Sequence, residues 1–310
     1  MHLLIPFASA LSERGAHTLR KLKLPNLTQL LARLSPTERL GSDEYSLSPP
    51  HELALANALG WQGEDGAFPW AARNAARDGI DTGTHAWGQL TPVHWHVGAD
   101  HVSLPDPANL HLSAQESHTL FEAVKPLFES EGWVMAWGAP MRWYAAHDSL
   151  AGLPSASLDR VIGRNIDLWL PPTPQARLIR RLQNEVQMLL YQHPLNDHRV
   201  GQGALPVNSF WLSGCGRAQP VKAPEGMVCA SGLRTSAVGS NWAGWAEAWQ
   251  AIDTHEVKQA LERARAGEAV TLTLCGERFA QRFEPQAQGL WSRMGRRFSP
   301  PPVAPVLEAL

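Results

Sequence analysis

Cysteine and unbalanced charge are both scarce in this 310-residue chain. Its three cysteines, Cys215, Cys229 and Cys275, are too few and too scattered for a disulfide framework or a zinc site. We therefore expect reduced thiols and a cytoplasmic location. Lysine and arginine (27 residues) nearly balance aspartate and glutamate (29 residues), and the net charge of −2 predicts no surface for nucleic acid or for an anionic membrane.

Long hydrophobic runs are also missing. A membrane-spanning helix needs roughly 20 consecutive apolar residues, and no segment of this sequence approaches that length. Residues 1–10 superficially resemble a signal peptide, but no Lys or Arg precedes their apolar run and Pro6 interrupts it. We interpret this segment as a first buried strand and expect no membrane association. Hydrophobic residues make up 44% of the chain, which predicts a globular protein.

Strand and helix patterns alternate at both ends of the chain, which predicts an α/β fold with a mainly parallel sheet. Near the N-terminus, Asn26 is placed to cap a helix that begins at Leu27. The other elements expected in this alternating pattern are a strand at 3–7, helices at 51–59, 175–191 and 254–266, and strands at 210–212 and 270–274.

The middle of the chain has a different pattern. Residues 93–97 alternate as in a half-buried strand, and Ser113 with Glu116 forms a capping box at the start of a helix. Two more strands are expected at 133–137 and 141–144. This β-α-β-β order, followed by a proline-rich linker, predicts a small inserted α+β subdomain at 90–175 within a core made of 1–89 and 176–310.

Three motifs carry a resemblance to a known family. They are Pro25-Asn-Leu-Thr-Gln-Leu-Leu31, then Gly41-Ser-Asp43, and a long motif that runs from His193-Pro-Leu-Asn-Asp-His-Arg199 to Gly216. In order and spacing they resemble the archaeal-type cofactor-independent phosphoglycerate mutases of the alkaline-phosphatase superfamily. The long motif is the most specific, and it is also similar to a poorly characterised bacterial family. Some members of that family are labelled phosphoglycerate mutase and others regulatory protein.

The resemblance implies a truncated alkaline-phosphatase-like core that holds the inserted subdomain. It also implies a serine nucleophile at Ser42, which two divalent metals would activate for phosphoryl transfer. The sequence departs from the family at the metal ligands. Phe7-Ala-Ser-Ala10 follows the first strand, where the family has an aspartate, and Cys275-Gly-Glu-Arg278 stands where the family has an Asp-Glu-x-Gly-His-Asp segment.

The C-terminal ligands are missing as well, because no Asp and no His follows His255. Glu277 and Glu284 are the plausible substitutes, and we interpret both as solvated charges. Ser42 then has no activating metal, and we interpret it as a turn residue or helix N-cap beside Asp43, at the position of a vestigial nucleophile.

We therefore predict a non-catalytic phosphoglycerate-mutase-like protein without a metal or cofactor, which acts as a binding or regulatory protein. Its partner would be a small anionic ligand or another protein. The alternative is a phosphatase or phosphomutase with an altered or relocated metal site. A third possibility is a purely structural partner protein that uses its tryptophan-rich surface.

The long motif offers a candidate ligand site. With Ser42, the residues His193, Asn196 and Arg199 would form a residual anion-binding cleft, because a guanidinium matches a two-oxygen acceptor. The competing interpretation is structural: His193 and Asn196 would cap the preceding helix, and Arg199 would pair with Asp197 or a nearby carbonyl.

Histidines and a cysteine elsewhere raise further alternatives. His94 and His96 would share one face of a strand and, with His101, have spacing compatible with metal ligands. We prefer surface or partly buried histidines to a metal site or a substrate contact. Cys215, between two glycines, is interpreted as a small buried thiol rather than a reactive one.

Overall fold

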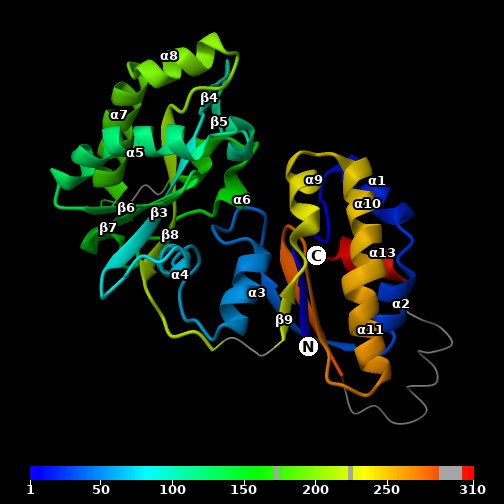
Figure 1. Cartoon of the computed structure of the whole chain (residues 1–310). Helices are drawn as coiled ribbons and strands as arrows, with labels where there is room; N and C mark the ends of the chain where they lie inside the picture. The colour runs from blue at the N-terminus through cyan, green and yellow to red at the C-terminus, as the bar shows by residue number, and fades with distance from the viewer. Residues whose placement is uncertain (171–173, 175, 223–225, 286–301) are drawn as a thin grey trace. The chain divides into compact units, whose positions relative to one another are not determined.

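The structure is a computed structural model, and it describes residues 1–170, 174, 176–222, 226–285 and 302–310. The chain forms two compact units, each with its own sheet (Figure 1). Residues 1–60 and 221–310 form what we call the core unit, and residues 61–220 form the inserted unit. The mixed α/β class predicted from the sequence is confirmed.

The predicted boundaries of the insertion are wrong at both ends. The inserted unit begins at Trp61 and ends at Pro220, rather than at 90 and 175. The reason is a strand pairing that local patterns do not reveal: β3 (Ala86–Val93) pairs antiparallel with β8 (Ser209–Arg217). The strand expected at 210–212 is part of β8, so it belongs to the inserted unit and not to the core.

The sheet of the core unit has the strand order β2-β11-β10-β1-β9. β1 pairs parallel with both β9 and β10, whereas β11 is antiparallel to its two neighbours, β10 and β2. All strands except β11 therefore run in the same direction. The strands are β1 (His2–Ile5), β2 (Ser35–Gly41), β9 (Met227–Cys229), β10 (Thr271–Cys275) and β11 (Phe279–Glu284).

Helices cover the two faces of this sheet unequally (Figure 1). The main apolar core lies on one face and includes fully buried Trp245 and Trp249. On the other face, α3 packs against a smaller cluster around Leu4 and Cys275. The helices are α1 (Glu13–Lys21), α2 (Pro25–Leu31), α3 (Pro50–Ala58), α9 (Arg234–Val238), α10 (Trp242–Ile252), α11 (Lys258–Arg265) and α13 (Val303–Glu308), with a π-helical turn at Asp253–Val257 between α10 and α11.

The start of α2 is stabilised from a distant part of the chain. Asn26 is not the N-cap, because α2 begins at Pro25 and Asn26 lies within its first turn. The buried carboxylate of Asp253 accepts hydrogen bonds from the backbone N–H of Leu27 (2.7 Å) and of Asn26 (3.2 Å). An anion at the first N–H groups of a helix satisfies donors that have no partner inside the helix.

The inserted unit contains an antiparallel sheet of order β6-β7-β3-β8. Helices α5 and α7 pack on one face, and α4 packs on the other face. Besides β3 and β8, the elements of this unit are α4 (Trp70–Arg77), β4 (His96–Val97), β5 (Val102–Ser103), α5 (Ala114–Glu129), β6 (Val134–Ala139), β7 (Arg142–Ala146), α6 (Leu158–Val161), α7 (Ala176–Tyr191) and α8 (Pro194–Gly201). The unit also has 3₁₀ turns at Pro107–Leu110, Asp148–Leu150 and Ile166–Trp169.

Several local predictions in this unit are confirmed. Ser113 and Glu116 form the reciprocal hydrogen bonds of a capping box at the start of α5. β6 and β7 form the predicted hairpin. The expected strand at 93–97 is divided between the end of β3 and the short strand β4, which pairs with β5. Among the residues described, no helix is long and apolar enough to span a membrane.

Candidate functional site

The candidate site lies at the carboxyl edge of the core sheet, where the parallel strands end. In open α/β sheets, ligands bind outside this edge. Strands β1, β9, β10 and β2 all end here, and Ser42 directly follows β2. The topology therefore places the predicted nucleophile position at the edge where catalytic residues are expected.

The chain that leaves β1 provides apolar packing at this edge. Phe7 has a left-handed φ of 56°, and its ring lies 5.0 Å from the ring of His51. The Phe7 carbonyl accepts a hydrogen bond from Nε1 of Trp245 (3.0 Å), and the N–H of Ala8 donates to the carbonyl of Cys275 (2.7 Å). Backbone hydrogen bonds thus hold an aromatic side chain where the resembled family has an aspartate.

The chain that leaves β10 turns back at once into β11. The N–H of Gly276 donates to the carbonyl of Phe279 (2.9 Å), which closes a tight hairpin turn. Leu310 packs over this turn, and a Cβ on Gly276 would lie 2.5 Å from the Leu310 Cβ. The segment that carries metal ligands in the resembled family is therefore a closed turn in this protein.

The two proposed substitute ligands are engaged in other contacts. Glu277 accepts a hydrogen bond from the backbone N–H of Leu11 (2.8 Å), and Glu284 forms an ion pair with Arg282 (2.7 Å). Within the described ranges, no group of three or more His, Cys, Asp or Glu side chains is arranged to hold a metal ion. The residues at this edge do not fit a two-metal centre.

Ser42 lies in a turn. The preceding residue, Gly41, has a φ of 106°, and a Cβ at that position would lie 2.2 Å from the carbonyl oxygen of Arg278. The carboxylate of Asp43 accepts a hydrogen bond from the N–H of Tyr45 (2.8 Å), which is typical of an Asx turn. Ser42 is exposed and does not cap a helix, because α3 begins only at Pro50.

Two of the three cysteines are buried and are poor nucleophiles. Burial raises the pKa of the Cys275 thiol well above its ordinary value, and burial also raises the pKa of Cys229. In the inserted unit, burial raises the pKa of Cys215 to about 12. Because the thiolate is the reactive form, the buried thiols of Cys215 and Cys275 are poor nucleophiles at neutral pH, whereas Cys229 is exposed. The interpretation of Cys215 as a buried thiol is confirmed.

Arg199 is committed to internal contacts and is not available to a ligand. Only 3% of its side chain is exposed, and its guanidinium forms an ion pair with Glu116 (2.6 Å). Its remaining donors bind the carbonyls of Leu110 (2.5 Å) and Leu205 (2.9 Å). Burial alone would raise the pKa of Glu116, but hydrogen bonds from Ser113 and the charge of Arg199 lower it below its ordinary value.

Asn196 and His193 also have structural roles. The Asn196 amide donates to the carbonyls of Leu190 (2.8 Å) and Val207 (2.7 Å) and accepts from the N–H of Val207 (2.9 Å). His193 caps α8 by accepting from the N–H of Leu195 (3.2 Å). His193 was expected to cap the preceding helix, and it caps the following one. The prediction that Asn196 and Arg199 line an anion-binding cleft is wrong, because their polar atoms are already satisfied.

The histidines of the β4–β5 region do not form a metal site in the part of the chain that the structure describes. His94 makes a ring-nitrogen hydrogen bond with the carbonyl of Pro206 (2.9 Å). His96 and His101 are exposed. The preferred interpretation of these residues as surface or partly buried histidines agrees with this arrangement.

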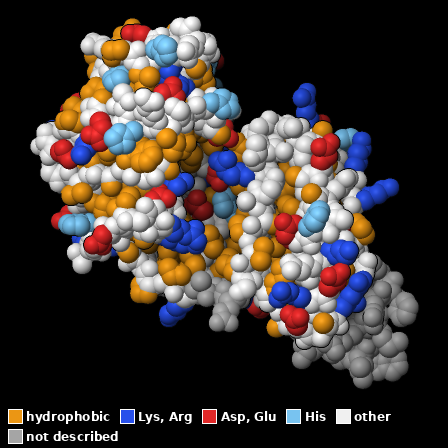
Figure 2. Space-filling view, in the orientation of Figure 1, with side chains coloured by type: hydrophobic (Ala, Val, Ile, Leu, Met, Phe, Trp, Pro, Cys, Tyr) orange, Lys and Arg blue, Asp and Glu red, His pale blue; other side chains and the backbone are white. Residues whose placement is uncertain are grey.

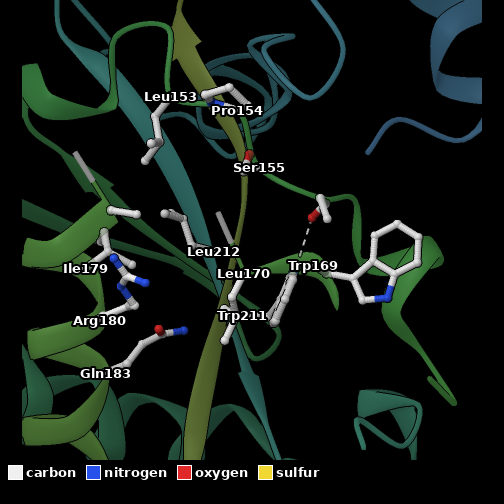
Figure 3. A pocket seen from close by; sticks show the side chains of 12 residues that line it. Leu153, Pro154, Ser155, Trp169, Leu170, Ile179, Arg180, Gln183, Trp211 and Leu212 are labelled. Atoms are coloured by element: carbon white, nitrogen blue, oxygen red, sulfur yellow. Dashed lines mark hydrogen bonds between the residues drawn. The ribbon is translucent and has the colours of Figure 1, made fainter. Parts of the chain in front are cut away.

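A small apolar cavity in the inserted unit is a second candidate (Figure 3). Its volume is about 30 Å³, enough for one or two water molecules. Trp169, Ile179 and Trp211 line it, and Nε1 of Trp211 donates to the carbonyl of Ala156 (2.9 Å). A cavity of this size does not accommodate an organic ligand.

The visible face of the described residues shows no dominant charge (Figure 2). Figure 2 shows acidic and basic side chains mixed with hydrophobic ones on the visible face of the molecule. This distribution matches the near-zero net charge, and it gives no broad positive area on that face for a phosphate backbone.

Comparison with known proteins gives a distant relationship. No family model matches the sequence. Over 109 residues, 35% of this chain, the sequence is 28% identical to a probable 2,3-bisphosphoglycerate-independent phosphoglycerate mutase of Geobacter sulfurreducens. The match spans 27% of that relative's length. Over about a third of its length, the chain is thus similar to a probable phosphoglycerate mutase.

Two solved structures align over nearly all of the chain. One is a cofactor-independent phosphoglycerate mutase from Thermoplasma acidophilum, with 14% identity, a TM-score of 0.38 and coverage of 99% of this chain and 98% of that chain. The other is the PH0037 protein from Pyrococcus horikoshii, with 11% identity, a TM-score of 0.45 and coverage of 95% of this chain and 92% of that chain.

Sequence reasoning missed the contacts that explain the long motif. It identified Glu116 only as part of a capping box, whereas the same carboxylate is the partner of Arg199, 83 residues away. It also missed Asp253, which caps α2. A lone Arg and a lone acid in two distant segments give no local signal of pairing.

Proposed function

We propose that this protein is a non-catalytic relative of the cofactor-independent phosphoglycerate mutases that acts as a binding or regulatory protein. The observation that carries the proposal is the carboxyl edge of the core sheet. Phe7 and the turn at Gly276 occupy the places from which metal-binding carboxylates and imidazoles would have to extend.

The chemistry of phosphoryl transfer explains why a serine without metal ligands would be inactive. A serine hydroxyl is a weak nucleophile until a base or metal activates it, and the charge that develops on the phosphoryl group must be neutralised. Hard divalent metals bind carboxylate and imidazole ligands that converge on one point. Among the described residues, the Asp43 carboxylate accepts from the N–H of Tyr45, the Glu277 carboxylate accepts from the N–H of Leu11, and no three such groups converge. In the part of the chain that the structure describes, Ser42 therefore has no metal site to activate it.

The contacts of the long motif favour a protein as the partner over a small anion. Arg199 was the best candidate for an anion contact, but its side chain is 3% exposed and each of its three nitrogens donates to Glu116 or to a carbonyl. We accordingly propose that the protein functions through contacts with another protein. A cytoplasmic location is part of this proposal, supported by the three free thiols.

A coupled assay for phosphoglycerate mutase tests the loss of catalysis. The purified full-length protein and the Ser42→Ala variant would be assayed with 3-phosphoglycerate in the presence and absence of Mn²⁺ and Co²⁺. We expect no turnover above the buffer rate for either protein. Turnover that requires both Ser42 and added metal would contradict the proposal and favour the alternative of a phosphomutase with an altered metal site.

A further inference from the structure

The edges of the two main sheets differ in how they are protected. An open edge strand presents unpaired N–H and C=O groups, so natural proteins shorten, charge, interrupt or cover their edges to avoid unwanted pairing. In the described structure the edge strands are β2 and β9 in the core unit, and β6 and β8 in the inserted unit. Three of these four strands are charged, short or contacted by side chains of the same unit.

The two edges of the core sheet are protected by sequence and by length. β2 contains Pro36, which lacks an N–H group, and the charged residues Glu38 and Arg39. β9 is only 3 residues long. Neither strand offers a long apolar edge to another chain.

The β8 edge of the inserted sheet is protected by other parts of the same unit. Nε2 of Gln183, on α7, donates to the carbonyl of Phe210 (3.3 Å). The hydroxyl of Ser155 accepts from the N–H of Cys215 (3.4 Å). Side chains therefore satisfy backbone groups of β8.

The one protection of β6 that the described structure shows is a register irregularity near its end, between Trp137 and Ala139. Its six residues, Val134-Met-Ala-Trp-Gly-Ala139, include no charge and no proline. β7 pairs with one side of the strand, and within the described ranges no strand or side chain hydrogen-bonds to the other side. Val134, at the start of the strand, is 52% exposed.

Both faces of β6 are nevertheless anchored in the unit. Ala136 packs in the cluster beneath α4, and Nε1 of Trp137 donates to the hydroxyl of Ser117 on α5 (3.1 Å). The strand is therefore held in an extended conformation with one edge open. A preformed edge of this kind adds a strand without a large ordering cost.

We propose that β6 pairs antiparallel with β6 of a second copy of this chain, which joins two four-stranded sheets across a two-fold axis. A two-fold interface brings the same surface of each copy together, so it must be complementary to itself. An uncharged strand meets this requirement because its pairing opposes no like charges.

Helix α5, which lies beside β6, is compatible with the same arrangement. The ring of His118 lies 5.6 Å from the ring of Trp137, and Glu122, Lys125 and Glu129 continue from His118 at helical spacing. This row carries both signs of charge. A second α5 that approaches in antiparallel orientation would therefore meet opposite charges as well as like ones.

Sedimentation velocity of the full-length protein over a range of concentrations tests the pairing. We expect a concentration-dependent dimer for the wild type. Val134→Lys, which places a charge at the open edge, should weaken dimerisation at least tenfold. Val134→Thr keeps β-branching without charge and should retain the dimer. Val200→Lys adds the same charge at a 59% exposed valine on α8 and should also retain it.

Hydrogen exchange of the wild type gives a readout that needs no substitution. The amides of 134–139 should become more protected as protein concentration rises through the dimerisation range. A monomer at every concentration would overturn the proposal. So would a dimer that Val134→Lys leaves intact, or one whose formation does not change exchange at β6.

Discussion

The motifs that carry the family resemblance have different structural roles in the core unit and in the inserted unit. In the core unit, Ser42 remains at the carboxyl edge of the sheet and is exposed, but the described residues form no group of three or more metal ligands. In the inserted unit, Arg199 and Asn196 are 3% and 5% exposed and fully engaged in internal hydrogen bonds. Internal packing thus explains the long motif. The motif Gly41-Ser-Asp43, in contrast, keeps its position at the sheet edge without a metal site within the described ranges. A sequence match in one unit therefore says little about activity in the other.

The largest expected effect lies in the inserted unit, at Arg199. Arg199→Ala leaves Glu116 without its partner and the carbonyls of Leu110 and Leu205 without donors. We expect a loss of about 3 kcal/mol in the free energy of unfolding, because removing one member of a buried pair leaves the other uncompensated. Urea unfolding, with hydrogen exchange at α8 as a local reporter, measures it.

The matched control is Arg181→Ala on α7. Arg181 also pairs with glutamates, but about half of its side chain is exposed. Exposed pairs contribute little, and we expect a change below about 0.5 kcal/mol. Equal effects of the two substitutions would contradict the structural role of Arg199. Stability that rises in the wild type when small anions are added, but not in Arg199→Ala, would restore the ligand-binding interpretation.

The second effect is in the core unit, at Asp253. Asp253→Ala removes the acceptor for the N–H groups of Asn26 and Leu27. We expect a loss of about 2 kcal/mol, as for a strong N-cap whose donors are left buried. Glu262→Ala, at an exposed position on α11, is the control and should change stability little. Exchange protection at α2 that is unchanged in Asp253→Ala would refute the capping role.

A smaller, pH-dependent effect is expected from His2 in β1. Burial, together with the positive charge of Arg282, lowers the pKa of His2 to about 4 in the folded protein, against about 6.5 for an ordinary histidine. As the pH falls below 6.5, the unfolded chain takes up the proton first. The contribution of neutral His2 to stability is therefore present above pH 6.5 and is lost as the pH falls towards 4.

Urea unfolding from pH 7 to pH 5 measures this dependence. We expect a decrease of up to about 2 kcal/mol that is attributable to His2. His2→Gln keeps a polar group near the hydroxyl of Thr273, which hydrogen-bonds the His2 ring at 2.8 Å, but it does not titrate in this range. The substitution should make the free energy of unfolding less dependent on pH between pH 7 and pH 5. Identical pH profiles for both proteins would show that His2 is not the responsible group.

The smallest effect is expected at Ser42. Ser42→Ala changes an exposed turn residue, so the free energy of unfolding should stay within about 0.5 kcal/mol of the wild type. The neighbouring Gly41→Ala is the contrast, because a Cβ there would collide with the Arg278 carbonyl at a φ of 106°. We expect that substitution to destabilise clearly. A large effect of Ser42→Ala in thermal unfolding would reveal a structural contact for its hydroxyl.

The sequence predicted local features well and the partners of distant segments poorly. The capping box at Ser113, the β6–β7 hairpin and the α/β class follow from short-range patterns, and the structure confirms them. The pairing of β3 with β8 joins segments more than 100 residues apart, so periodicity did not locate the true limits of the inserted unit. The missing metal ligands were visible as residue types, but the closed turn at Gly276 that takes their place was not.

The most direct test of the central claim is calorimetric titration of the full-length protein with Mn²⁺, followed by elemental analysis after gel filtration. The account predicts no stoichiometric, high-affinity binding of divalent metal, because among the described residues no three His, Cys, Asp or Glu side chains converge at the carboxyl edge of the core sheet. Two tightly bound Mn²⁺ ions per chain, with binding that Ser42→Ala weakens, would contradict the account and restore a phosphoryl-transfer site at this edge.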